Sequence, residues 1–192
     1  MSQQKLEIEV DKALEHLKKG NTILYPTDTV WGIGCDATKT SAVKKIYNIK
    51  QRDKSKSLII LVDSIAMLKN YVAYLPESIY AISKNASNPT TVIYPKAKNV
   101  AKNAVAADGS IAIRIIKNEF CNLLLKKFGK PIISSSANIS GCPTPLVFRK
   151  ISQEVIKRVN HIVDIDKDRI SNIKPSTIIR VDNNGLIEII RD

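Results

Sequence analysis

Cysteine, histidine and long apolar runs are scarce in this sequence of 192 residues, and each shortage excludes a class of protein. The three cysteines show no CxxC spacing and neither of the two histidines lies beside a cysteine pair, so no structural zinc site is expected. The longest uninterrupted apolar run, Leu58–Val62, is too short to cross a bilayer. The charged, periodic N-terminal segment matches neither a signal peptide nor a transit peptide. We therefore expect a cytoplasmic protein with no membrane partner.

The sequence also lacks the familiar glycine-rich nucleotide motifs. There is no GxxxxGK[ST] segment, and Gly32-Ile33-Gly34 lacks the third glycine of GxGxxG. If a triphosphate binds, it must be held by separate cationic side chains and backbone donors rather than by a P-loop.

Basic residues are present in excess. The 30 lysines and arginines against 18 acidic residues give a net charge of +12, which suits a polyanionic ligand such as a nucleotide or RNA. Lysine outnumbers arginine, and isoleucine and asparagine are also frequent, so a general drift in composition explains the charge equally well. The charge alone leaves both interpretations open.

Alternating strand and helix patterns predict an α/β protein, and the absence of repeats or linkers predicts one domain over residues 1–192. Helices are predicted over residues 6–17 ending at Gly20, 40–50 capped by Thr40, after a cap at Asp63, over 76–84, over 118–128 capped by Asn118, and over 151–159. Strands are predicted over residues 22–25, 58–62, 91–94, 111–116 and 132–134. Residues 176–181 and 186–191 flank Asn183-Asn184-Gly185, which predicts a closing antiparallel hairpin and hence a mixed sheet.

Four segments are polar where the core of an α/β protein does not require it. They are YPTDTVWGIG at 25–34, KQRDKSKS at 50–57, SSSANISG at 134–141, and Pro175-Ser176-Thr177 together with Arg191. Taken singly, each also fits a turn or a solvated loop. The third directly follows a predicted apolar strand, and the carboxyl ends of strands in open α/β sheets commonly face the ligand crevice.

Taken together and in order, YPTDTVWGIG, KQR, IAIR, SSSANISG, PSTII and IIR resemble the YrdC/TsaC family along nearly the whole chain. That family makes L-threonylcarbamoyl-AMP from L-threonine, bicarbonate and ATP, for N6-threonylcarbamoyladenosine at position 37 of tRNAs. The resemblance implies a nucleotidyltransferase of the short, single-domain form. It also implies a twisted mixed sheet with flanking helices around a basic concave cavity, and a product that passes to the threonylcarbamoyl transferase complex.

The resemblance further implies a set of site residues. Lys50 and Arg52, which match the KxR motif, are expected to be exposed, catalytic contacts of the ATP phosphates. Other nucleotide contacts are expected at Lys56, Ser110, Ser136, Asn138, Ser140 and Arg191. The threonine substrate is expected at Thr29, Arg114 and Ser176, and a guanidinium such as that of Arg114 can bind a carboxylate through two parallel hydrogen bonds. Mg²⁺ is expected on the ATP phosphates and not on protein side chains.

Two other functions remain open at this point. One is a non-catalytic RNA-binding or ribosome-maturation protein that uses the same basic cavity, although Trp31 is the one aromatic residue near the expected site and gives little surface for base stacking. The other is an accessory domain of a carbamoyl transferase, which normally lies within a much longer chain. Release of pyrophosphate that depends on threonine separates the enzyme from both.

Overall fold

The computed structural model describes residues 2–53, 55–85, 88–170 and 175–191. Its helices are α1 (Gln3–Lys18), α2 (Thr40–Lys50), α3 (Ile65–Leu68), α4 (Glu77–Asn85), α5 (Glu119–Phe128) and α6 (Gln153–Arg158), with short 3-10 helices η1 (Lys102–Ala104) and η2 (Phe148–Lys150). Its strands are β1 (Ile23–Tyr25), β2 (Gly32–Asp36), β3 (Ile59–Val62), β4 (Thr90–Tyr94), β5 (Ile111–Ile115), β6 (Ile132–Ser136), β7 (His161–Ile162), β8 (Thr177–Val181) and β9 (Ile187–Arg191).

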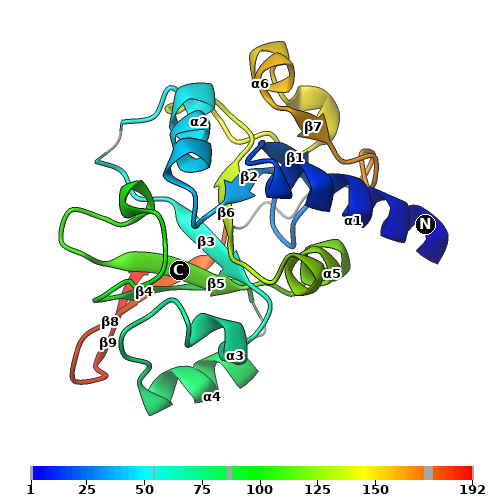
Figure 1. The fold of residues 1–192 in the computed structure, drawn as a ribbon. Coiled ribbons are helices and arrows are strands. Elements are labelled where there is room, and N and C mark those ends of the chain that lie inside the picture. The colour runs from blue at the N-terminus through cyan, green and yellow to red at the C-terminus, as the bar shows by residue number, and fades with distance from the viewer. Residues whose placement is uncertain (1, 54, 86–87, 171–174, 192) are drawn as a thin grey trace.

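The strands form one mixed sheet in the order β7-β1-β2-β6-β3-β5-β4-β8-β9 (Figure 1). The pairs β7/β1, β3/β5 and β4/β8 are parallel, and the other neighbours pair antiparallel. The sheet confirms the predicted α/β class, and the closing hairpin β8–β9 is antiparallel as predicted. The single domain over residues 1–192 stays a prediction.

Helices cover both faces of this sheet. On one face, α1 and α5 lie together (Figure 1), and their leucines share a buried cluster with Tyr25, Leu61 and Ile132 of the strands. On the opposite face, α2, α3, α4 and α6 contribute buried apolar residues to a larger cluster that includes Ile33 and Ile60. Because successive residues of a strand point to opposite faces, Ile60 and Leu61 fall in different clusters.

Several local signals act as the sequence predicts. Helix α1 ends at Lys18, and Gly20 follows with a φ of +72°, a left-handed conformation that glycine adopts without steric cost. The side chain of Asn118 accepts a hydrogen bond from the Cys121 N–H and caps α5, which confirms the predicted cap. Gly185, with a φ of +82°, lies in the turn of the β8–β9 hairpin.

Other local predictions are wrong. No strand was predicted at residues 32–36, and a turn or loop was one interpretation of 25–34, but residues 32–36 form strand β2. The predicted strand 132–134 continues to Ser136 because β2 pairs with it along its whole length. Helix α3 is capped by Ser64 and not by Asp63, since the Ser64 hydroxyl accepts the Met67 N–H. Thr40 is the first residue of α2 and not its cap.

The helices were compared with the length and apolar character that a membrane span requires. Within the described ranges, none of them is both long enough and apolar enough to cross a bilayer.

Candidate functional site

A cavity of about 480 Å³ opens on the face of the sheet that carries α1 and α5, beyond the area that these helices cover. Residues of six neighbouring strands, from β2 to β8, reach it. Their cross-strand partners explain why they share one face: Ile59 lies beside both Ser134 and Ala112, and Arg114 lies beside Thr91. We call this space the hydroxyl-lined cavity.

The wall of the hydroxyl-lined cavity is polar and positively charged. Its hydroxyl groups belong to Thr27, Thr29, Ser57, Thr91, Ser134, Ser135, Ser136, Thr144 and Ser176. Its charged side chains are Arg52, Arg114 and Arg191, and among the described lining residues there is no Asp or Glu. A concave wall with charge of one sign concentrates ligands of the opposite sign, so the cavity suits an anionic small molecule.

All three residues expected to hold threonine meet in this cavity. The Thr29 hydroxyl lies 3.5 Å from Nη1 of Arg114. The Ser176 hydroxyl lies 2.9 Å from that of Thr91 on β4, and Nη2 of Arg191 donates to the Ser176 carbonyl at 2.7 Å. These segments come from distant parts of the chain, and the parallel pairing of β4 with β8 brings Ser176 to the site.

Arg114 is buried and forms an ion pair with Asp28. Its Nη2 lies 3.2 Å from Oδ1 of Asp28, and the two side chains are only 5% and 10% exposed. The contact is an ion pair without hydrogen-bond geometry, so Asp28 Oδ1, like Arg114 Nε, has no hydrogen-bond partner within the described part of the chain. Unpaired polar atoms at such depth are costly, and a ligand that accepts from Arg114 removes part of that cost.

Lys50 does not lie in the exposed position expected for it. It is 1% exposed, and its ammonium donates to the carbonyls of Ser136 and Asn138, the latter at 2.8 Å, and to Oδ1 of Asn138 at 3.3 Å. Burial, with the positive charge of Arg52 as a smaller cause, lowers the pKa of Lys50 to about 8. The expected exposure is wrong because the end of β6 folds over the lysine and supplies it with acceptors.

The other residues expected to contact the nucleotide form two groups, of which the first lines the hydroxyl-lined cavity and the second does not. Arg52 lines the hydroxyl-lined cavity and donates to the carbonyls of Lys56 and Ser57 at 3.2 and 3.0 Å. Ser136 also lines it and donates to Oδ1 of Asn138 at 2.6 Å. Arg191 lines the same cavity, and the phosphate contacts expected of all three residues stay predictions.

The other residues expected to contact the nucleotide do not line the hydroxyl-lined cavity. Ser140 and Asn138 are not among the residues that line the cavity. The Ser140 N–H donates to the Lys50 carbonyl at 2.7 Å, and Nδ2 of Asn138 donates to the Cys142 carbonyl at 2.6 Å. Ser110 lines an adjoining hollow of about 340 Å³, which shares Ser57, Ile93 and Ala112 with the hydroxyl-lined cavity. Lys56 is exposed at the surface. The nucleotide roles of all these residues stay predictions.

Sequence reasoning missed several hydroxyls of the wall. Thr27, Thr91, Ser134 and Thr144 line the cavity but were not expected there. Thr27 lies in the YPTDT segment beside Thr29, and its hydroxyl donates to the Val30 carbonyl at 2.7 Å. The two threonines at the start of β4, Thr90 and Thr91, are polar residues before an apolar run and are the signal that could have revealed Thr91.

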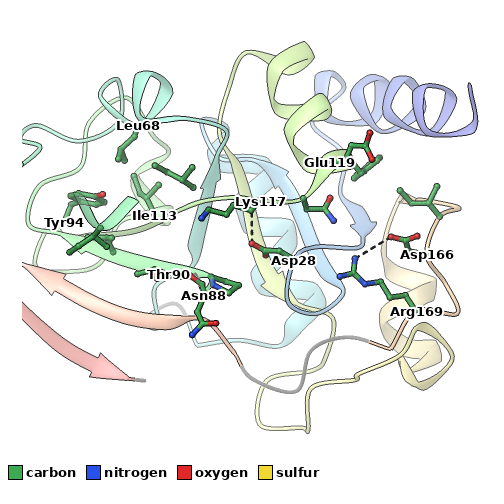
Figure 2. A pocket seen from close by; sticks show the side chains of 17 residues that line it. Asp28, Leu68, Asn88, Thr90, Tyr94, Ile113, Lys117, Glu119, Asp166 and Arg169 are labelled. Atoms are coloured by element: carbon green, nitrogen blue, oxygen red, sulfur yellow. Dashed lines mark hydrogen bonds and ion pairs between the residues drawn. The ribbon is translucent and has the colours of Figure 1, made fainter. Parts of the chain in front are cut away.

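A second cavity of about 450 Å³ lies on the other side of β4 and β5 (Figure 2). Apolar side chains such as Tyr94 and Ile113 line one part of it, and Asp28, Lys117 and Asp166 line another. Asp28 thus borders the second cavity, while its partner Arg114 borders the hydroxyl-lined cavity. The ion pair thus joins a residue that lines one cavity to a residue that lines the other.

No cysteine is among the described residues that line the hydroxyl-lined cavity, and the exposed Cys142 lies outside that lining. Among the residues that the structure describes, no three His, Cys, Asp or Glu side chains are placed to hold a metal ion. Cys35 and Cys121 are buried, and burial raises the pKa of each thiol.

The mixed sheet with its basic, hydroxyl-lined hollow defines a class: single-sheet α/β proteins with a concave site suited to a small anionic ligand. Comparison with known families narrows the class. The chain belongs to the Sua5_yciO_yrdC family, whose model carries the description Telomere recombination and matches residues 15–192.

Relatives of similar length share this family. A threonylcarbamoyl-AMP synthase of Pseudoalteromonas translucida is 36% identical over 169 residues, which is 86% of this chain and 89% of the relative. A putative threonylcarbamoyl-AMP synthase of Methanocaldococcus jannaschii is 35% identical over 187 residues, which is 95% of this chain and 87% of the relative.

Solved structures agree with the fold. Sua5 of P. abyssi, in a crystal structure described as complexed with L-threonine, has a TM-score of 0.82 and 28% identity over 90% of this chain. This chain spans only 50% of that protein's length. YciO of E. coli has a TM-score of 0.81 at 24% identity, covers 95% of this chain and 88% of its own, and supports the fold alone.

Proposed function

We propose that this protein is an L-threonylcarbamoyladenylate synthase, a nucleotidyltransferase that joins L-threonine, bicarbonate and ATP to L-threonylcarbamoyl-AMP and releases pyrophosphate. The product serves the formation of N6-threonylcarbamoyladenosine at position 37 of tRNA, through the threonylcarbamoyl transferase complex. The reaction takes place in the cytoplasm, where its substrates and tRNA are found.

The observation that carries the proposal is the meeting of two kinds of side chain in one cavity. Thr29, Arg114 and Ser176 provide an amino-acid end, and Arg52 and Ser136 provide a phosphate end, in a space of about 480 Å³. The names of the relatives support the same reaction, since they are threonylcarbamoyl-AMP synthases over most of this chain's length.

At the amino-acid end, Arg114 offers what a carboxylate needs. Its guanidinium is buried and has an Nε–H with no partner in the described part of the chain, so a substrate carboxylate gains a charge-assisted hydrogen bond there. The hydroxyls of Thr29 and Ser176 can donate or accept, and they suit the substrate's own hydroxyl.

At the phosphate end, the charge comes from arginine. Arg52 lines the cavity there, and the ammonium of Lys50 donates to the carbonyls of Ser136 and Asn138. Arg191 also lines the cavity, where it donates to the Ser176 carbonyl, and it can reach a phosphate from the amino-acid end. Mg²⁺ is proposed to enter with ATP, bound to its phosphate oxygens.

The reaction requires alignment more than a protein nucleophile. The threonine amine and bicarbonate combine into a carbamate with loss of water, and a carbamate oxygen then attacks the α-phosphorus as the bond to pyrophosphate breaks. Holding these groups in line and neutralising the charge on the leaving pyrophosphate supply the acceleration. The buried, protonated thiols of Cys35 and Cys121 fit this chemistry, since no covalent intermediate is needed.

Pyrophosphate release tests the proposal directly. The purified protein should release pyrophosphate from ATP only when threonine, bicarbonate and Mg²⁺ are all present, and omission of each in turn provides the control. Removal of Mg²⁺ with EDTA should stop the reaction and leave the fold intact. Tight RNA binding without pyrophosphate release would instead favour the non-catalytic RNA-binding function.

A further inference from the structure

Asp28 and Arg114 form an ion pair that joins the linings of the two cavities. Arg114 lines the hydroxyl-lined cavity, Asp28 lines the second cavity, and their charged atoms lie 3.2 Å apart. Oδ2 of Asp28, on the side of the second cavity, lies 3.5 Å from the backbone N–H of Lys117 (Figure 2). The carboxylate thus lies between a strand arginine, with which it forms an ion pair, and the loop that precedes α5, whose N–H is a long contact.

The contacts of Arg114 leave one part of its guanidinium available. Nη2 faces Asp28, and Nη1 lies at 3.5 Å from the Thr29 hydroxyl, a long contact. Nε has no partner among the described residues although the side chain is 5% exposed. The arginine is therefore held at Nη2 and carries an unused buried donor.

We propose that Asp28 is a positioning residue that fixes Arg114 for the carboxylate of the amino-acid substrate. This rests on the proposed function, because it assigns to Arg114 the carboxylate of threonine. Asp28 touches no substrate in this scheme and acts only through the guanidinium. Its neighbour in sequence, Thr29, lines the cavity itself, so one loop residue positions the arginine and the next faces the ligand.

Asp28 has two opposing effects on the binding of a substrate carboxylate to Arg114. Its negative charge offsets part of the attraction that Arg114 exerts on a second carboxylate. Against that, a long arginine side chain without Asp28 loses the counter-charge that lies 3.2 Å from Nη2 and helps to set its orientation, and a misplacement of about 1 Å at a reacting group can cost about 100-fold in rate. We take orientation to be the larger effect, so loss of Asp28 should weaken the binding of threonine and not strengthen it.

The first experiment compares Asp28→Asn with Asp166→Asn. Asp166 also lines the second cavity but pairs with Arg169, at 3.8 Å, so its substitution removes a charge from the same cavity without touching Arg114. In Asp28→Asn, the KM for threonine and the dissociation constant of threonine measured by calorimetry should rise about 10- to 100-fold. The KM for ATP should not change, and Asp166→Asn should behave as wild type.

A double-variant series guards against a loss of folding. Asp28→Asn alone leaves a buried arginine without its counter-charge, whereas Asp28→Asn with Arg114→Gln removes both charges and is expected to fold. If Asp28 acts through Arg114, adding Asp28→Asn to Arg114→Gln produces no further loss of threonine binding. A further loss of similar size in the Arg114→Gln background, or a rise in the KM for ATP equal to that for threonine, would overturn the proposal.

Threonine binding separates this proposal from the proposed function. Wild-type protein that binds threonine but releases no pyrophosphate refutes the synthase activity, and the calorimetric series then still decides the role of Asp28. Wild-type protein that binds no threonine in the presence of ATP overturns both. Unchanged threonine binding in a folded Asp28→Asn variant overturns the positioning role alone.

Discussion

The ammonium of Lys50 lies 2.8 Å from the carbonyl oxygen of Asn138, and the Lys50 carbonyl in turn accepts the N–H of Ser140 at 2.7 Å. The KQR and SSSANISG segments are therefore joined in both directions. Lys50 is at the end of α2 and Ser136 at the end of β6, so this network fixes how the helix meets the strand. The lysine supports the phosphate end of the cavity without lining it.

Lys50→Ala and Arg52→Ala should separate stability from activity. Loss of the buried ammonium leaves the carbonyls of Ser136 and Asn138 without their donor, so Lys50→Ala should lower the free energy of unfolding by about 2–4 kcal/mol. Arg52 is only half-buried, so Arg52→Ala should change stability by less than about 1 kcal/mol while pyrophosphate release falls about 100-fold or more. Urea unfolding and turnover of both variants check this. Equal stability of the two variants would contradict the supporting role of Lys50.

Lys50 also predicts a pH dependence of stability. Burial lowers its pKa from 10.5 to about 8 in the folded protein. Between these values the unfolded chain binds more protons at this residue than the folded one, so this contribution to stability increases as the pH rises from about 8 to about 10. Lys50→Met lacks the titrating group, so the stability of the wild type relative to Lys50→Met should rise across that window. If the stability of the wild type relative to Lys50→Met stays constant or falls as the pH rises from about 8 to about 10, then burial does not lower the pKa of Lys50.

The sequence predicts which residues form the site better than it predicts how deeply each of them is buried. Thr29, Arg114 and Ser176 were expected together and do line one cavity, because the motifs that carry them lie at strand ends of a single sheet. Lys50 was expected to be exposed because its segment is dense in cations, but its burial depends on the end of β6, whose carbonyls close over it. A contact between segments that are far apart in the sequence, such as Lys50 and the end of β6, produces no local sequence pattern from which burial could be predicted.

The ion pair between Asp28 and Arg114 was likewise invisible in the sequence. In the YPTDT segment an aspartate fits a loop residue that caps local amides, and its partner lies on a strand in the middle of the sheet. Strand β2 escaped prediction for a different reason. Its glycines disfavour a strand by intrinsic propensity, and the close approach of Tyr25 and of the neighbouring strand β6 to Gly34 explains why a side chain is excluded there.

Gly34→Ala should therefore destabilise the protein. A Cβ at Gly34 would lie 2.6 Å from the Ile133 carbonyl oxygen and 2.6 Å from the Tyr25 ring, both of them fixed in the sheet. Overpacking of this kind costs about 1–3 kcal/mol. Gly32→Ala is the matched control, since its Cβ would meet the Ser134 hydroxyl at 3.0 Å, and that side chain can rotate. Thermal unfolding should rank wild type, Gly32→Ala and Gly34→Ala in that order; a Gly34→Ala variant as stable as Gly32→Ala would refute the steric argument.

Amino-acid choice should follow the polarity of the cavity. The hydroxyls of Thr29 and Ser176 line it, and each already has a hydroxyl neighbour, Thr27 at 3.1 Å and Thr91 at 2.9 Å. Valine would bring a methyl to these polar groups, and a site built to bind a hydroxyl can reject such an analogue by about 10⁴-fold. Serine keeps the hydroxyl and loses one methyl contact, worth about 1–3 kcal/mol. Pyrophosphate release at matched concentrations should thus decrease from threonine to serine and then steeply to valine. Valine outperforming serine would mean that the cavity selects shape and would remove Thr29 and Ser176 from their proposed roles.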